Sequence, residues 1–260
     1  MAEVVIVDSP ETAGTLVARS IAARVRAEPE FTLGVATGST PLPVYAALER
    51  ERAGGLDLSR VNAFALDEYV GLPEQHPESY HSVIRREVTE PLGLDPVRVH
   101  VPDGDESTIA TAGERYEAAL IENGGVDLQL LGIGTDGHVG FNEPGSSLAS
   151  LTRIKTLTAR TRADNARFFD SPAQVPTHCI TQGIGTILRA DHLVLMAFGA
   201  GKAAAIAAAV EGPVSASWPG SCIQLHRHVT VVVDEPAAAR LERADYYRWV
   251  YEHKPAWQGL

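Results

Sequence analysis

Apolar runs rich in β-branched residues alternate with longer segments of helical composition from one end of the chain to the other. This alternation is typical of βα units that build a mainly parallel sheet. We expect strands at residues 4–7, 32–36, 61–66, 97–101, 128–132, 192–198 and 229–233, and a shorter strand at 153–157. The expected helices cover residues 11–26, 42–52, 79–88, 107–122, 183–189, 202–210 and 236–249. The sequence therefore predicts an α/β fold and, because no linker or repeat divides the pattern, a single domain over residues 1–260.

The composition is that of an ordinary globular protein. Hydrophobic residues make up 45% and charged residues 21% of the 260 positions, and no apolar run approaches the roughly 20 residues that cross a bilayer. The first residues lack the basic segment of a signal peptide, so we expect a cytoplasmic protein without a membrane partner. The formal net charge of −11 would repel nucleic acid, and an anionic small molecule would need a few local donors to overcome the same field.

Metal and cofactor motifs are sparse. Cys179 and Cys222 lie far apart and lack the CxxC spacing of metal and redox sites, so we expect buried free thiols. His226 and His228 alternate near the start of a strand, but two histidines without a third ligand make a poor metal site. Neither a Walker loop nor a GxGxxG fingerprint follows a strand. We therefore expect no metal site, and these motifs give no support for nucleotide binding.

In open α/β sheets, ligands bind beyond the carboxyl ends of the strands, so the segments that follow strands are the first to search. Thr37, Gly38, Ser39 and Thr40 follow the second expected strand and precede Pro41 at the start of a helix. Small residues and free N–H groups at a helix N-terminus form an anion site. An N-cap with a tight turn explains the same residues equally well.

Charged residues follow two other strands. Asp67 and Glu68 end the apolar run of the third strand, where one acid could be a general base or the pair could cap a helix or form a salt bridge. Adjacent residues of a strand point in opposite directions, so only one of them faces a given ligand. Lys202 opens an Ala-rich helix, where it suits a bound anion or is simply solvated.

The Gly-rich segment 132–147 carries the densest candidate chemistry. His138 follows Asp136 by two positions and precedes Glu143 by five. Two nearby carboxylates can fix the tautomer of an imidazole and raise its basicity. The spacing therefore predicts a loop that transfers protons.

A basic run follows this loop. Arg153 and Lys155 alternate, which places both on one face of the short expected strand, and Arg160, Arg162 and Arg167 come next. The pair could hold a second anion, although surface solvation explains it as simply.

Taken in order, these segments resemble the glucosamine-6-phosphate deaminase family over nearly the whole chain. The resemblance rests on seven segments, none of which is specific alone: 36–41, 66–72, 76–80, 134–144, 146–150, 152–157 and 218–226. It implies a Rossmann-like three-layer sandwich with a mainly parallel central sheet. It also implies amino-sugar catabolism, in which glucosamine 6-phosphate and water give fructose 6-phosphate and ammonia without a cofactor.

The resemblance assigns a role to each candidate. His138 would open the sugar ring, with Asp136 and Glu143 orienting it, and Asp67 would carry hydrogen from C2 to C1. The substrate phosphate would bind the following set: Thr37, Gly38, Ser39, Thr40, Arg167 and Lys202. Arg167 belongs to a segment, around residues 155–180, that works as a mobile lid in this family.

Regulated members of the family are activated by an N-acetylated amino-sugar phosphate. Their activator site, at a subunit interface of a hexamer, matches Ser146, Arg153, Lys155 and Thr156. It also includes a tyrosine near the C-terminus, and a count without gaps from residues 234–236 places Arg248 at that position. A homo-oligomer is expected, whereas activation and the preference between the gluco and galacto epimers stay open.

Two other functions fit parts of the pattern. A 6-phosphogluconolactonase shares the implied fold but usually lacks the sequence Phe-Asn-Glu-Pro, which is present here at residues 141–144. A sugar-phosphate-sensing regulator would carry a helix-turn-helix, whereas this chain begins with an expected strand and is acidic. Both functions are therefore less favoured than the deaminase.

Overall fold

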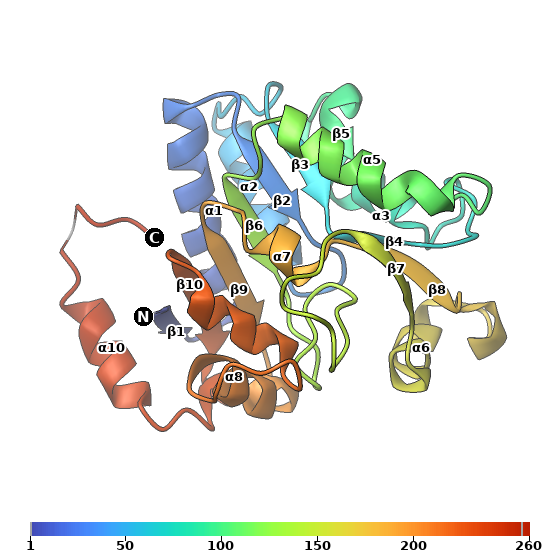
Figure 1. The fold of residues 1–260 in the computed structure, drawn as a ribbon. Coiled ribbons are helices and arrows are strands. Elements are labelled where there is room, and N and C mark those ends of the chain that lie inside the picture. Colours follow the sequence, from blue (N-terminus) through green and yellow to red (C-terminus); the bar gives the residue numbers. More distant parts are fainter. Residues whose placement is uncertain (1, 256) are drawn as a thin grey trace.

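A seven-stranded parallel sheet forms the centre of the protein in a computed structural model, which describes residues 2–255 and 257–260 (Figure 1). The strands lie in the order β1 (Glu3–Val7), β10 (Val229–Asp234), β9 (Leu193–Ala197), β6 (Leu128–Leu131), β2 (Thr32–Val35), β3 (Asn62–Ala65) and β5 (Val99–His100). Each of them pairs with its neighbours in parallel register. The α/β class and the mainly parallel sheet are confirmed.

Helices cover both faces of this sheet and complete the three layers (Figure 1). On one face pack α1 (Pro10–Ala27) and α2 (Leu42–Ala53). The helices of the other face are α5 (Ile109–Glu122), α7 (Ile184–Ile187), α8 (Ala203–Val210) and α9 (Glu235–Ala238). The last helix, α10 (Ala244–Glu252), packs beside the edge strand β1.

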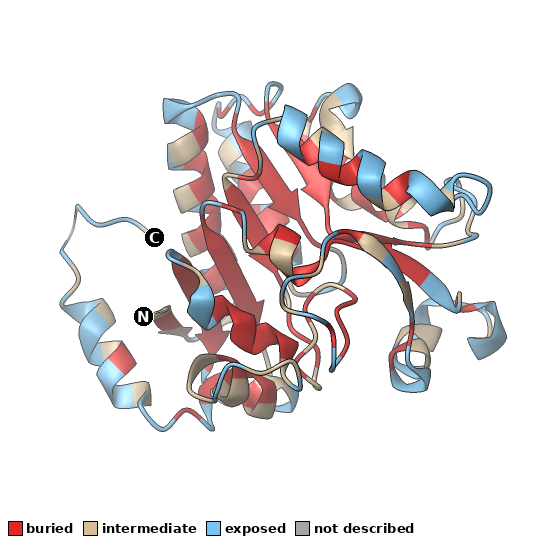
Figure 2. Ribbon diagram, in the orientation of Figure 1, coloured by how far each residue is buried: buried red, intermediate tan, exposed pale blue. Residues whose placement is uncertain are grey.

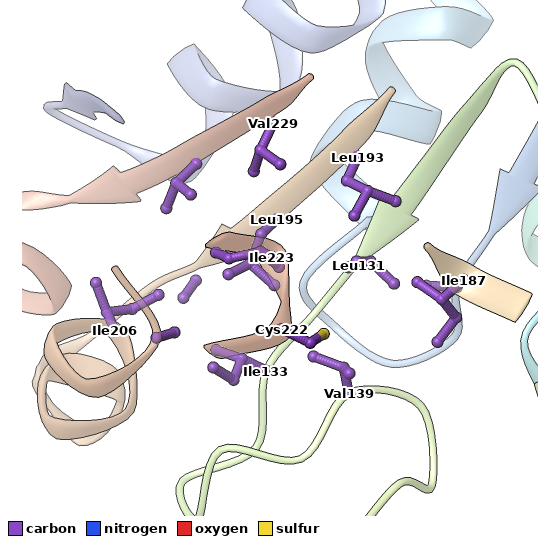
Figure 3. Close-up of a cluster of buried hydrophobic side chains, with 14 of the residues drawn as sticks. Leu131, Ile133, Val139, Ile187, Leu193, Leu195, Ile206, Cys222, Ile223 and Val229 are labelled. Atoms are coloured by element: carbon purple, nitrogen blue, oxygen red, sulfur yellow. The ribbon is translucent and has the colours of Figure 1, made fainter. Parts of the chain in front are cut away.

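The strands are apolar on both faces because both faces are covered. In β9, Leu193 and Leu195 belong to one core cluster, whereas Val194 and Met196 belong to the other. Figure 2 shows the sheet buried between exposed outer helix faces. Figure 3 shows the first cluster, in which Ile206 of α8 lies among side chains of the sheet. This two-sided core fixes the strand ends that carry the candidate residues.

A second sheet extends from the main body, and the sequence pattern predicted only one of its strands, at residues 153–157. It is antiparallel, in the order β4 (Asp67–Tyr69), β8 (His178–Thr181) and β7 (Arg153–Thr156). Between β7 and β8 the chain forms α6 (Ala159–Asn165) and two 3₁₀ turns, Ala166–Phe168 and Pro172–Gln174. The ends of the segment expected to be a lid, around residues 155–180, are therefore strands, and its middle is helical.

Two expected helices differ from the structure. The helix expected at 79–88 starts as α3 (Tyr80–Ile84), widens to a π-turn (Arg85–Thr89) and ends as α4 (Glu90–Leu92). The helix expected at 236–249 is two helices, α9 and α10, and the expectation of one was wrong. Glu211 accepts the backbone N–H groups of Glu242 and Arg243, which are then not available to a helix.

Cys179 and Cys222 are both buried and free, as expected. No helix within residues 2–255 and 257–260 is both long enough and apolar enough to cross a membrane.

Candidate active site

A cavity of about 1080 Å³ opens at the carboxyl end of the main sheet. It lies where the strand order reverses, because β2 connects onward to β3 on one side while its other neighbour, β6, connects onward to β9. Open α/β sheets bind ligands at such a switch point. Residues that follow β2, β3, β6 and β9 all line the cavity, which brings together segments far apart in the chain.

The loop after β2 forms one wall. Thr37, Gly38, Ser39 and Thr40 all line the cavity, and α2 begins just after them. Gly38 has φ +85°, and no atom lies within 4 Å of the position that a Cβ would occupy there. We expect an anion to bind at this point, because free N–H groups at a helix N-terminus attract negative charge.

Positive side chains reach the same cavity from two other segments. Lys202, after β9, donates its ammonium to the carbonyl of Ile133 at 2.7 Å, and burial lowers its pKa. Arg167 lies in the 3₁₀ turn that follows α6, and Arg160 of α6 donates to Thr135 Oγ1 at 2.7 Å. All three cations line the cavity. Two of them, Arg160 and Arg167, belong to the helical segment between β7 and β8.

Asp67 and Glu68 point in opposite directions, as the strand geometry requires. Asp67 lines the cavity, whereas Glu68 accepts the N–H groups of Tyr80 and His81 at 2.9 and 3.0 Å. Glu68 thus caps the first turn of α3, as one of the two explanations for the pair requires, and Asp67 is the acid of the pair that faces the cavity. Asp67 is 6% exposed, and burial together with the negative charge of Glu68 raises its pKa to about 8.

His138 lies above two carboxylates that are not part of the cavity wall. Its Nδ1 is 2.7 Å from Oδ1 of Asp136 and 3.9 Å from Oε2 of Glu143. The 2.7 Å contact has the distance of a hydrogen bond but not its alignment, so both Nδ1 and Oε2 of Glu143 are buried without a hydrogen-bond partner. Interaction with the His138 side chain holds the pKa of Asp136 well below its usual range. The ring itself is 25% exposed, so its outer edge faces the cavity.

The position of the ring depends on its own loop. Ile133 and Val139, on either side of His138, are buried in the core cluster and anchor the loop (Figure 3). Gly134 lies under the ring, since a Cβ there would be 2.2 Å from Cε1 and 2.3 Å from Nδ1 of His138. The loop can therefore hold the imidazole over the cavity only because residue 134 has no side chain.

Two carboxylates beside an imidazole could also bind a metal ion. The ligand atoms of Asp136, His138 and Glu143 all lie within 4.8 Å of one another. Two ligands of a tetrahedral zinc ion, each about 2.0 Å from the metal, sit about 3.3 Å apart. The 2.7 Å contact between Asp136 and His138 is shorter than this, so these two side chains, as they lie, are too close together to be ligands of one such ion.

The expected activator residues lie outside this cavity. Arg153 and Lys155 share one face of β7, which is the edge strand of the small sheet, and Thr156 ends that strand. Ser146 is buried at 3% exposure, and its Oγ has no hydrogen-bond partner. Figure 1 shows α10, which carries Arg248, on the opposite side of the molecule from β7. Arg248 pairs with Glu235 at 2.6 Å instead.

An aromatic wall of the cavity was missed from the sequence. Tyr69, Tyr80, Phe141 and Phe169 line it, and the rings of Tyr80 and Phe141 stack with their centroids 6.1 Å apart. These residues come from separate segments and share no spacing. Tyr69, Phe141 and Phe169 each lie two positions from a candidate site residue, whereas Tyr80 has no such neighbour in the sequence.

Comparison with known proteins gives close relatives over the full length. The chain is 58% identical to the glucosamine-6-phosphate deaminase of Bifidobacterium longum (strain DJO10A) over 272 residues, with 100% of both chains covered. It is 61% identical to that of Streptomyces coelicolor (strain ATCC BAA-471 / A3(2) / M145) over 260 residues, which covers 99% of this chain and 100% of the relative.

Solved structures agree with this similarity. A monomeric glucosamine-6-phosphate deaminase matches with a TM-score of 0.89 and 36% identity, covering 92% of this chain and 100% of that one. The 6-phosphogluconolactonase of Trypanosoma cruzi matches with a TM-score of 0.73 at 19% identity, covering 93% of this chain and 97% of that one, and shows the shared fold alone. The model of the family "Glucosamine-6-phosphate isomerases/6-phosphogluconolactonase" matches residues 8–232, and the chain belongs to this family.

Proposed function

We propose that this protein is a glucosamine-6-phosphate deaminase, which converts glucosamine 6-phosphate and water to fructose 6-phosphate and ammonia. The observation that carries the proposal is that a buried carboxylate, Asp67, and an imidazole, His138, reach one cavity from different strand ends. An anion-binding loop and cations line another part of that cavity. A base, an acid–base group and a phosphate site are what an aldose–ketose isomerisation of a sugar phosphate needs. The named activity of the relatives at 57–61% identity supports the same reaction.

The phosphate end of the substrate would lie against the loop after β2. Thr37, Ser39 and Thr40 supply hydroxyl groups, and the loop supplies N–H groups, with Gly38 allowing close approach. Lys202 and Arg167 would add charge-assisted contacts to the same oxygens. These local donors overcome the net negative charge of the chain, which alone would repel an anion.

Ring opening requires a group that moves a proton between the ring oxygen and the anomeric hydroxyl. His138 is suited to this step because its outer edge faces the cavity while Nδ1 faces Asp136 and Glu143. The two carboxylates stabilise the imidazolium that forms when the His138 side chain accepts a proton. Asp136 and Glu143 thus act on the substrate through His138.

Hydrogen transfer from C2 to C1 follows once the aldehyde is free, because the carbonyl makes the hydrogen on C2 acidic. Asp67 is the proposed base and would return the proton to C1, through an enol-type intermediate. Its pKa of about 8 means that the free enzyme carries the proton at neutral pH. The amino group on C2 arrives as an ammonium, whose positive charge favours the ionised carboxylate. The substrate would therefore help to produce the base that attacks it.

The resulting imine at C2 is hydrolysed, which releases ammonia and leaves the ketone. No step requires a redox or electron-sink group, so we propose a reaction without cofactor or metal. Lactone hydrolysis on the same fold needs no base at carbon, and no feature of this cavity favours it over the deaminase. The Phe-Asn-Glu-Pro segment at residues 141–144 places Glu143 behind His138.

The setting of the enzyme is part of the proposal. We propose a cytoplasmic homo-oligomer, with a hexamer as one form, that binds neither nucleic acid nor membrane, and a mobile lid at residues 155–180 on a single domain. Ser146, Arg153, Lys155 and Thr156 would form the activator site. Because α10 lies far from β7, a C-terminal residue could complete that site only from a neighbouring subunit.

An ammonia-release assay tests the function. Purified protein is given glucosamine 6-phosphate or galactosamine 6-phosphate without added metal or nucleotide, and ammonia and fructose 6-phosphate are measured together. We expect equal amounts of the two products from the gluco substrate. Absence of ammonia from correctly folded protein would refute the proposal. Repeating the assay with N-acetylglucosamine 6-phosphate tests activation.

A further inference from the structure

The two oxygens of the Glu143 carboxylate have different neighbours. Oε2 faces Nδ1 of His138 at 3.9 Å, whereas Oε1 faces away from the ring and accepts hydrogen bonds from two threonines. Thr161 Oγ1 donates at 2.5 Å and Thr158 Oγ1 at 3.3 Å. Glu143 is 4% exposed, so no solvent replaces these donors. The orientation of Oε2 towards the imidazole therefore depends on what holds Oε1.

Both threonines belong to the start of α6. Thr158 is its N-cap and accepts the N–H of Thr161 at 3.2 Å, so the two hydroxyls are fixed by the helix itself. Thr161 lines the cavity but is only 5% exposed, and its hydroxyl contacts Glu143 and the hydroxyl of Thr158. A hydrogen bond to a buried carboxylate is among the stronger contacts of a protein. The first turn of α6 thus acts as a clamp on Glu143.

The same helix joins the phosphate side of the cavity to the imidazole side. Arg167 follows α6 directly in a 3₁₀ turn, and Arg160 of α6 donates to Thr135, within the loop that carries His138. The helix therefore contacts the loop on both sides of His138, at Thr135 and at Glu143. Arg167 and the threonines that hold Glu143 therefore belong to one continuous segment.

We propose that Thr161, supported by Thr158, is a positioning residue for ring opening. Its hydroxyl holds Glu143 with one oxygen towards His138. The alignment of the imidazole therefore depends on the position of α6. This role rests on the proposed function, because it names how the lid segment acts on the group that opens the ring. Valine, which has a methyl group in place of the hydroxyl, removes the hydrogen bond with little change in shape.

The chain offers a matched control. Thr186 of α7 donates to Oε1 of Glu117 at the same 2.5 Å and is 7% exposed, but neither residue lines the cavity. Thr186→Val removes an equally buried Thr–Glu hydrogen bond at a site away from the chemistry. Any loss of stability common to both valine variants is thereby separated from an effect on catalysis.

The experiment compares Thr161→Val, Thr161→Ser and Thr186→Val with the wild-type enzyme. For Thr161→Val we expect kcat on glucosamine 6-phosphate to fall about tenfold or more, the effect of losing a hydrogen bond to a charged group. KM and inhibition by inorganic phosphate should stay within about twofold, because the phosphate contacts remain. Thr161→Ser, which keeps the hydroxyl, should restore most of kcat, and Thr186→Val should keep the wild-type value. If Thr161→Val does not fold, Thr161→Ala gives the same comparison.

A second readout needs no substrate. The imidazole nitrogen signals of His138 in a ¹H–¹⁵N spectrum should shift in Thr161→Val and stay in place in Thr161→Ser and Thr186→Val. An unshifted His138 signal in Thr161→Val, an unchanged kcat, or an equal loss in the serine variant overturns the positioning role. Absence of ammonia from the wild-type enzyme overturns the proposed function instead, and the spectrum still decides whether the contact exists.

Discussion

Replacement of Asp67 by asparagine should change how the stability of the free protein depends on pH. The carboxyl group of Asp67 is buried beside the negative charge of Glu68, and both raise its pKa to about 8. In the unfolded chain the same group titrates near its ordinary value, about 4. Between these two values the folded protein keeps a proton that the unfolded chain has released. Stability that depends on this proton is complete below pH 4 and is lost as the pH rises towards 8.

The size of the effect follows from the pKa difference. Each pH unit between about 4 and 8 lowers the stability of the wild-type protein, relative to Asp67→Asn, by about 1.4 kcal/mol, or roughly 5 kcal/mol over the whole interval. For a chain of this length, 1 kcal/mol corresponds to about 2–4 °C in Tm. The asparagine variant should therefore gain on the order of 10 °C over the wild-type protein between pH 5 and pH 8.

Thermal unfolding followed by circular dichroism at constant ionic strength, from pH 5 to pH 8, measures this gap. Asp245→Asn is the control, because Asp245 is fully exposed and the substitution removes the same formal charge. Its Tm should follow that of the wild-type protein at every pH. A gap between Asp67→Asn and the wild-type protein that stays constant from pH 5 to pH 8 would show that Asp67 is already ionised in the free enzyme.

Three further predictions concern the cavity and the activator residues. Gly134→Ala should lower kcat about 100-fold without unfolding the protein, since the new Cβ displaces the His138 ring and a shift near 1 Å has that effect on catalysis; steady-state kinetics near wild type would contradict this. Lys202→Met should raise KM about tenfold or more and leave kcat nearly unchanged, as expected for a group that binds the phosphate; a loss confined to kcat would place the lysine in the chemistry instead. If N-acetylglucosamine 6-phosphate activates the enzyme, Arg153→Ala should abolish that activation and keep the basal rate, whereas activation that persists in this variant would exclude β7 from the site.

The main sheet could be predicted because its strands are covered on both faces. Such strands are continuous apolar runs bounded by helical segments, and the run at β9 is recognisable without any tertiary information. The small sheet could be predicted only at β7, which corresponds to the strand expected at residues 153–157. Its strand β4 has only three residues, of which two are acids, and it exists because Asp67 and Tyr69 pair with Thr181 and Cys179 far along the chain. The local sequence pattern does not indicate pairing between segments so far apart in the chain.

The candidate site was predictable where the chemistry is local in sequence. His138 and its two acids lie within one loop, so their spacing alone indicated a proton-transfer group. The partners of Glu143 were not predictable, because Thr161 and Thr158 meet it only through the fold. Which of Asp67 and Glu68 faces the cavity and which caps a helix likewise depends on where α3 begins.

The most direct test of the central claim, that Asp67 moves hydrogen from C2 of an amino-sugar phosphate, is proton NMR in deuterated water. Glucosamine 6-phosphate is incubated with the wild-type enzyme and with Asp67→Asn at concentrations that saturate both, and the C2 hydrogen and the products are followed. We predict ammonia and fructose 6-phosphate with the wild-type enzyme, and a variant that binds the substrate but leaves the C2 hydrogen in place. Exchange of that hydrogen by Asp67→Asn at the wild-type rate would contradict the account.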